Sequence, residues 1–226
     1  MTGFYYASYG LVIIGALISI IASWNVKRTY KKYSSYGNSR GIRAEQVAQA
    51  ILSSAGIYDV RIERVSGSLT DHYSPREKVL RLSDSVYGST SVAAIGVAAH
   101  ECGHAIQHAR GYFPLSLRSA VIPIVNIGST LSWPVILLGL IFGWTGLVDI
   151  GIILFSLVVI FQFITLPVEF NASGRALSIL RERNVLYGQE LEASRKVLIA
   201  AALTYVAALV SSILQLLRLV LLRRRR

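Results

Sequence analysis

The sequence predicts a mainly α-helical membrane protein with three to four transmembrane helices and a small α+β domain. Its mean hydropathy is +0.52 and only 15% of its 226 residues are charged, whereas an ordinary soluble domain has about a quarter. A membrane-spanning helix needs about 20 apolar residues. The long runs without Lys, Arg, Asp or Glu are 1–26, 119–148, 150–168 and 197–217.

The first transmembrane helix is expected over residues 4–25. Aromatic residues stand near both of its ends, Tyr9 and Trp24 among them, as is typical of the two membrane interfaces. No positive residue precedes the run, and it is longer than the apolar core of a signal peptide, so we expect an uncleaved anchor. The basic residues that follow it are Lys27, Arg28, Lys31 and Lys32. They place this end of the helix in the cytoplasm by the positive-inside rule.

Residues 27–118 form a polar region with 13 Lys or Arg and 7 Asp or Glu, and we expect them to fold in the cytoplasm. Apolar residues recur at helical spacing over 44–54, which predicts a helix. Residues 59–65 alternate between apolar and polar and predict a strand, and 79–82 predict a second one. The segment between them is rich in turn residues. A helix followed by a hairpin of these two strands is therefore expected.

The rest of the chain predicts a transmembrane hairpin over 120–167, a helix over 168–196 and an apolar C-terminal helix over 197–222. Arg118 before the hairpin, with Arg175 and Arg181 after it, agrees with cytoplasmic ends. A fourth full span would place the arginines from Arg223 to Arg226 outside, against the same rule. The last helix is therefore expected either to span the membrane or to lie in its interface.

The net charge of +11 is explained by contact with lipid. In a soluble protein such a charge would suggest nucleic-acid binding, but here the basic residues stand beside hydrophobic runs, where anionic headgroups attract them. We therefore expect the lipid bilayer as a partner and no nucleic acid. The single cysteine, Cys102, excludes an internal disulfide.

A helix is expected over 91–110, capped near Ser91 and ended by Gly111, and it contains the motif His100-Glu101-Cys102-Gly103-His104. Residues four apart share one face of a helix, so His100 and His104 can both reach one Zn²⁺ at about 2.0–2.1 Å. Glu101 lies beside that face, where it can take a proton from the water that zinc activates. Chance matches occur, but a Glu on so apolar a helix is costly unless it is paired or used.

A catalytic zinc site needs a third protein ligand. His108 lies about 12 Å along the helix from His100, too far for a shared ion, and the alternative spacing would need a histidine where Arg110 stands. Asp71, His72 and Glu169 remain, and we choose Glu169, because an acid directly after an apolar run is a functional candidate. The competing interpretation of Glu169 is an acid at a helix N-terminus, favoured by the helix dipole.

Four segments resemble the YugP-like bacterial membrane zinc metallopeptidases, which are of the gluzincin type and distantly similar to the HtpX-type and CAAX-prenyl membrane proteases. These segments are DHYSPREKVLRLSDSVY, AAHECGHAIQHA, VEFNAS and ALTYVAA. The resemblance implies a zincin-like catalytic domain with His100, His104 and Glu169 as zinc ligands and Glu101 as the catalytic base.

The resemblance also implies that an edge strand binds the substrate backbone, and residues 78–84 would be that strand. The distant relatives often carry Asp four residues after the ligand Glu. Ser173 stands there in this chain, so support for a histidine is expected from elsewhere. Tyr73, His72 and Tyr205 are the nearest candidates to stabilise the oxyanion.

The expected function is a membrane-embedded zinc endopeptidase that cleaves membrane or membrane-proximal proteins. We expect it in the cell membrane, the inner membrane of a bacterium, with several spans and an active site on the cytoplasmic side. A homo-oligomer or accessory membrane proteins are compatible with the sequence. The alternative is a non-catalytic zinc-binding scaffold or a chaperone-like partner of a protease. A metal transporter is disfavoured, because the spans offer few polar residues beyond Asn126 and Gln162.

Overall fold

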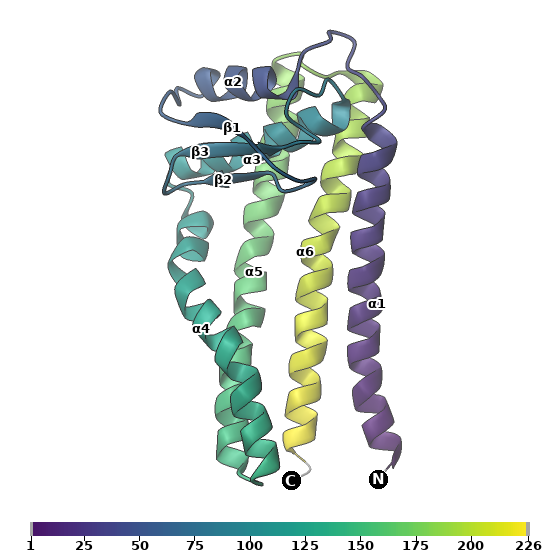
Figure 1. Cartoon of the computed structure of the whole chain (residues 1–226), viewed down its shortest axis with the longest axis vertical. Helices are drawn as coiled ribbons and strands as arrows, with labels where there is room; N and C mark the ends of the chain where they lie inside the picture. The colour runs from purple at the N-terminus through teal and green to yellow at the C-terminus, as the bar shows by residue number, and fades with distance from the viewer. Residues whose placement is uncertain (1, 225–226) are drawn as a thin grey trace. The chain divides into compact units, whose positions relative to one another are not determined.

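The computed structural model describes residues 2–224, with side chains from residue 9 onward. It is mostly helical with one small sheet, which confirms the predicted fold class (Figure 1). The helices are α1 (Thr2–Tyr33), α2 (Ala44–Ser54), α3 (Val92–Ala109), α4 (Phe113–Ile141), α5 (Thr145–Glu182) and α6 (Gly188–Arg223). The strands are β1 (Arg61–Val65), β2 (His72–Ser74) and β3 (Val79–Ser83).

The chain divides into two compact units. The membrane unit comprises the chain up to residue 23, residues 116–167 and the chain from residue 203. The polar unit comprises residues 24–115 and 168–202. Helices α1, α4, α5 and α6 each contribute to both units.

Four helices are long and apolar enough to cross a membrane: α1, α4, α5 and α6. In the most apolar windows of α1 and α5 only 11% of the residues are buried, so most of these apolar side chains lie on the surface. Such a surface is unfavourable in water and suits lipid. The protein is therefore a multi-pass membrane protein, and α6 fits a fourth span by length and composition.

Within the membrane unit, α1 and α6 meet through small polar residues. The Ser211 hydroxyl donates to the Gly15 carbonyl at 2.7 Å and lies 2.8 Å from the Ser19 hydroxyl. At the far end of α6, the Arg223 guanidinium forms two hydrogen bonds with the Asp149 carboxylate, at 2.7 and 2.9 Å. Because Asp149 lies near the start of α5, this pair holds the end of α6 beside the α4–α5 turn. Arg225 and Arg226 lie outside the described residues.

The sheet has the strand order β1-β3-β2, and this corrects the predicted hairpin. β1 pairs with β3 in parallel, whereas β2 pairs with β3 antiparallel. The turn-rich segment between β1 and β3 contains β2, which is too short for a periodic signal. The true hairpin is β2–β3, closed by Lys78 in a left-handed conformation (φ +53).

The topology also corrects the predicted edge strand over 78–84. β3 is the central strand, and its Val79, Leu80 and Leu82 are fully buried. Leu80 and Leu82 join one hydrophobic core with α2, α3, the end of α5 and the start of α6. The edges of the sheet are β1 and β2 (Figure 1).

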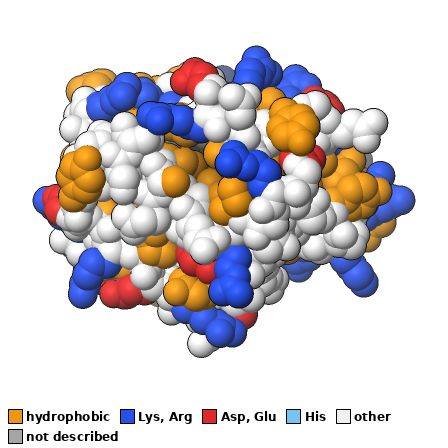
Figure 2. Space-filling view, turned by 90° about the horizontal axis from the view of Figure 1, so that it is seen from above, with side chains coloured by type: hydrophobic (Ala, Val, Ile, Leu, Met, Phe, Trp, Pro, Cys, Tyr) orange, Lys and Arg blue, Asp and Glu red, His pale blue; other side chains and the backbone are white. Residues whose placement is uncertain are grey.

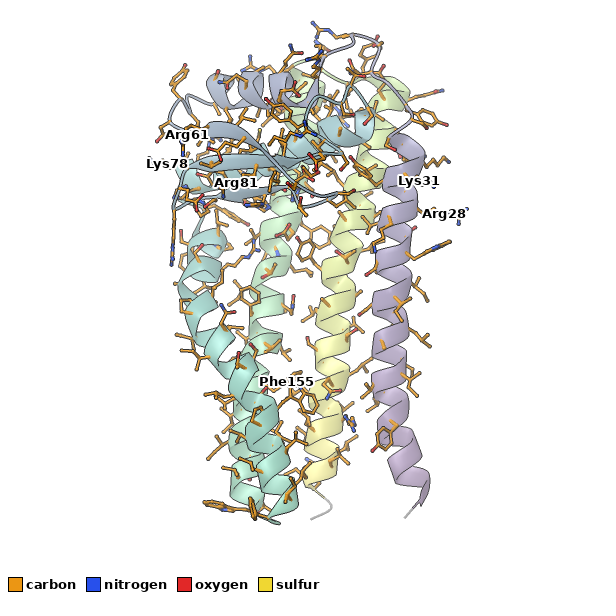
Figure 3. All side chains as sticks on the ribbon, viewed as in Figure 1. Arg28, Lys31, Arg61, Lys78, Arg81 and Phe155 are labelled. Atoms are coloured by element: carbon orange, nitrogen blue, oxygen red, sulfur yellow. The ribbon has the colours of Figure 1, made fainter. Side chains whose placement is uncertain are left out.

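The surface of the polar unit carries charges of both signs. Arg28 and Lys31 project from α1, and Arg61, Lys78 and Arg81 lie on or next to the strands (Figure 3). Those near the strands pair with acids, as Arg81 does with Glu63 at 3.4 Å. Seen from above, Lys and Arg side chains are spread among acidic and apolar ones (Figure 2). This mixture is typical of a surface that faces water.

Residues 168–196 do not form a separate helix, contrary to our expectation. Helix α5 runs through Pro167 without a break and ends at Glu182. The chain then turns through Asn184 and Gly188, both with positive φ, and α6 begins. The segment after the apolar run is therefore a continuation of α5.

Candidate metal centre

Helix α3 presents His100 and His104 on one face. The Ser91 hydroxyl accepts the amide of Ala94 at 3.2 Å and caps the helix, which ends before Gly111 in a left-handed conformation (φ +62). The two imidazole rings lie edge to face with their centroids 4.7 Å apart. One helical turn thus places both side chains at a single site.

Helix α5 approaches this face closely because residue 103 is glycine. A Cβ at Gly103 would lie 2.6 Å from the carbonyl oxygen of Ala172, closer than real Cβ contacts come. Ala172 is three residues after Glu169, so this contact lies within one turn of that acid. Glu169 is only 2% exposed, and its carboxylate points at the two histidines.

Three donor atoms converge at the site. Glu169 Oε2 lies 3.3 Å from His100 Nε2 and 3.6 Å from His104 Nε2, and all three ligand atoms lie within 4.8 Å of one another. A tetrahedral ion with bonds of about 2.0–2.1 Å separates its ligands by about 3.3–3.4 Å. A direct charged hydrogen bond would be about 2.7–2.9 Å. The spacing therefore fits three ligands around one ion better than direct pairing.

Both histidines are held through the other ring nitrogen. His100 Nδ1 lies 3.1 Å from the Ser173 hydroxyl, and His104 Nδ1 lies 3.0 Å from Gln107 Oε1. The expectation that Ser173 could not support a histidine was wrong, since a hydroxyl one turn after Glu169 reaches the ring. Such contacts orient metal-binding imidazoles, and they leave both Nε2 atoms facing Glu169.

The electrostatics of the site favour a cation. Glu101 is 8% exposed and adds a second carboxylate beside the cluster. Burial opposes protonation of His104, but the neighbouring carboxylates of Glu169 and Glu101 together raise its pKa. A divalent cation would balance the two carboxylates with both imidazoles neutral, so the donor set fits Zn²⁺.

The other candidate ligands are engaged elsewhere. The Asp71 carboxylate accepts the amide and the hydroxyl of Ser83, at 2.7 and 2.9 Å, and burial raises its pKa. His72 is exposed, with Nδ1 2.9 Å from the carbonyl of Thr70. His108 is also exposed and bonds to the Tyr73 hydroxyl at 2.8 Å. Tyr205, the remaining candidate for the oxyanion, lies on α6 in the membrane unit.

Sequence reasoning missed Gln107, which is fully buried and links α3 to α5. A signal for it existed. Positions 100, 104 and 107 follow the i, i+4, i+7 spacing of one helix face, and a polar residue on so apolar a helix needs partners. Asn171 and Arg175 complete the link on α5, with Arg175 Nε donating to Asn171 Oδ1 at 2.7 Å.

Comparison with known proteins agrees with this geometry. Residues 8–224 match the family described as "Putative neutral zinc metallopeptidase". The chain is 46% identical over 212 residues to "Putative membrane protease YugP" of Bacillus subtilis (strain 168), covering 94% of each chain. No solved structure matches it. With nearly its whole length inside the match, and with two histidines and a glutamate gathered at one site, the chain belongs to this family of neutral zinc metallopeptidases.

Proposed function

We propose that this protein is a zinc-dependent endopeptidase of the bacterial inner membrane that cleaves membrane or membrane-proximal proteins. The convergence of His100 Nε2, His104 Nε2 and Glu169 Oε2 carries the proposal. These residues would hold the zinc, and Glu101, next to His100 in the chain, would be the catalytic base. An intact acid at this position favours an enzyme over a scaffold, because metal binding alone does not need it.

Bound zinc would lower the pKa of a water molecule and polarise the carbonyl of the scissile peptide bond. Glu101 would accept a proton from that water through its carboxylate. The water oxygen forms a new bond to the carbonyl carbon, and the carbon–nitrogen bond breaks. Glu101 then returns the proton to the leaving nitrogen, so one water and one peptide bond become a carboxylate and an amine.

Membrane proteins are the proposed substrates because the metal site follows directly on an apolar run. Residues 150–168 carry no charge, and Glu169 is the next residue on the same helix. The basic flanks at Lys31 and Lys32 favour a cytoplasmic active site. β2 is an edge strand, and we propose it as the strand that an extended peptide joins.

The test is proteolysis of a panel of purified membrane proteins by the full chain in lipid vesicles. We expect cleavage that stops when a chelator removes zinc and returns when zinc is added back. Cleavage that persists in the zinc-free protein would contradict the proposal. Absence of cleavage from every substrate by fully zinc-loaded protein would favour the scaffold instead.

A further inference from the structure

Gln107 uses both ends of its side-chain amide in a way that permits one orientation. Its Nε2 lies 2.9 Å from the main-chain carbonyl of Val168 and 3.0 Å from Asn171 Oδ1. A carbonyl oxygen only accepts hydrogen bonds. Arg175 Nε, which can only donate, donates a hydrogen bond to the same Asn171 oxygen. Both partners of Gln107 on α5 are therefore acceptors, so its nitrogen must face α5.

This orientation determines where the proton of His104 lies. With Nε2 turned toward α5, Oε1 of Gln107 faces His104 Nδ1 at 3.0 Å, and this oxygen can only accept. His104 must therefore carry a proton on Nδ1, so in the neutral imidazole the lone pair lies on Nε2, on the side of Glu169. That is the tautomer that a metal ion at the site requires.

His100 is held less strictly. Its partner is the Ser173 hydroxyl, which can donate or accept and therefore imposes no tautomer. The two histidines are thus supported differently, and only His104 has a partner that allows one proton position.

We propose that Gln107 is a positioning residue that fixes the tautomer and orientation of His104 through the main chain of α5. The carbonyl that it uses belongs to Val168, the residue before Glu169, so one side chain aligns two of the three proposed ligands. The inference rests on the proposed metal site. Loss of such a supporting group typically costs about 10–100-fold in metal affinity.

The test compares zinc affinity, by chelator competition, in the full-length protein and its variants. Gln107→Met keeps the length of the side chain without the amide, and Gln107→Asn keeps the amide but is one methylene too short for both partners. Gln49→Met, on the exposed face of α2, is the matched control. We expect about 10–100-fold weaker binding for both Gln107 variants and no change for the control. If the Met variant does not fold, the zinc affinity of the Asn variant decides the test.

A second readout separates positioning from general support of the fold. The chain has four histidines, so ¹⁵N-histidine labelling gives few imidazole signals, and His104→Ala assigns one. The zinc-loaded protein should show a protonated, hydrogen-bonded Nδ1 for His104, and this signal should shift or exchange rapidly in both Gln107 variants. Unchanged affinity, or weaker binding with an unchanged His104 signal, would overturn the inference. Failure of the wild type to bind zinc would instead overturn the proposed function itself.

Discussion

Substituting Gly103 with alanine should damage the metal centre without touching a ligand. The new Cβ would lie 2.6 Å from the Ala172 carbonyl oxygen and 3.1 Å from the Ala172 carbonyl carbon and Cα. These are backbone atoms and cannot rotate away. The helices must separate by about 0.4 Å before the closest contact reaches even 3.0 Å, whereas ligand distances in a working site are held within about 0.2 Å.

The cost should fall on zinc binding as well as on folding. Overpacking typically costs about 1–3 kcal/mol, and the higher helix propensity of alanine offsets about 1 kcal/mol of this. The free energy of unfolding should therefore fall by about 0–2 kcal/mol. Because α5 carries Glu169, its displacement should weaken zinc binding at least about 10-fold, the lower end for disturbed support of a metal site.

The assay measures zinc affinity by chelator competition and the thermal midpoint in the same detergent. Gly174→Ala is the control, because Gly174 also lies on α5 and a Cβ at this position would meet nothing within 4 Å. It should bind zinc as the wild type does. Wild-type zinc affinity in Gly103→Ala would refute the claim that close helix packing assembles the site.

Three further predictions concern the ligands, their support and the topology. Metal analysis of the folded protein should find that Glu169→Ala has lost stoichiometric zinc and that His108→Ala retains it. The reverse result would contradict the ligand set. Ser173→Ala should weaken zinc binding less than Gln107→Met does, because water can replace a hydroxyl beside the partly exposed His100. Equal losses of zinc affinity in a competition assay would contradict this. In a Cys102→Ala background, an impermeant thiol reagent should label Arg224→Cys from outside the cell and leave Ser35→Cys unlabelled. The Arg223–Asp149 pair places the end of α6 beside the α4–α5 turn, and labelling of Ser35→Cys from outside would refute the topology.

The helices were predictable from the sequence because their signals are local. The apolar runs are long enough to identify each span, and Ser91 and Gly111 mark the ends of α3 almost to the residue. The three proposed ligands were also predictable. The i, i+4 spacing brings His100 and His104 together, and the cost of an acid beside an apolar run draws attention to Glu169.

The sheet and the support of the histidines were not predictable, because both depend on contacts distant in sequence. The partners of β3 are decided by the 13 residues between β1 and β3, where a three-residue strand gives no periodic signal. Ser173 and Gln107 act only once Gly103 lets α5 approach α3. Without that contact, the sequence shows Ser173 only as a small residue and Gln107 only as a polar residue on an apolar helix, with no partner for either.

The most direct measurement of the central claim is the turnover of Glu101→Gln at equal zinc content. Gln is nearly isosteric with Glu and Glu101 is not a proposed ligand, so the variant should fold and bind zinc as the wild type does. It should lose the proton acceptor, and cleavage of a membrane substrate should slow by about 10²–10⁴-fold. Wild-type turnover by the zinc-loaded variant would contradict the account.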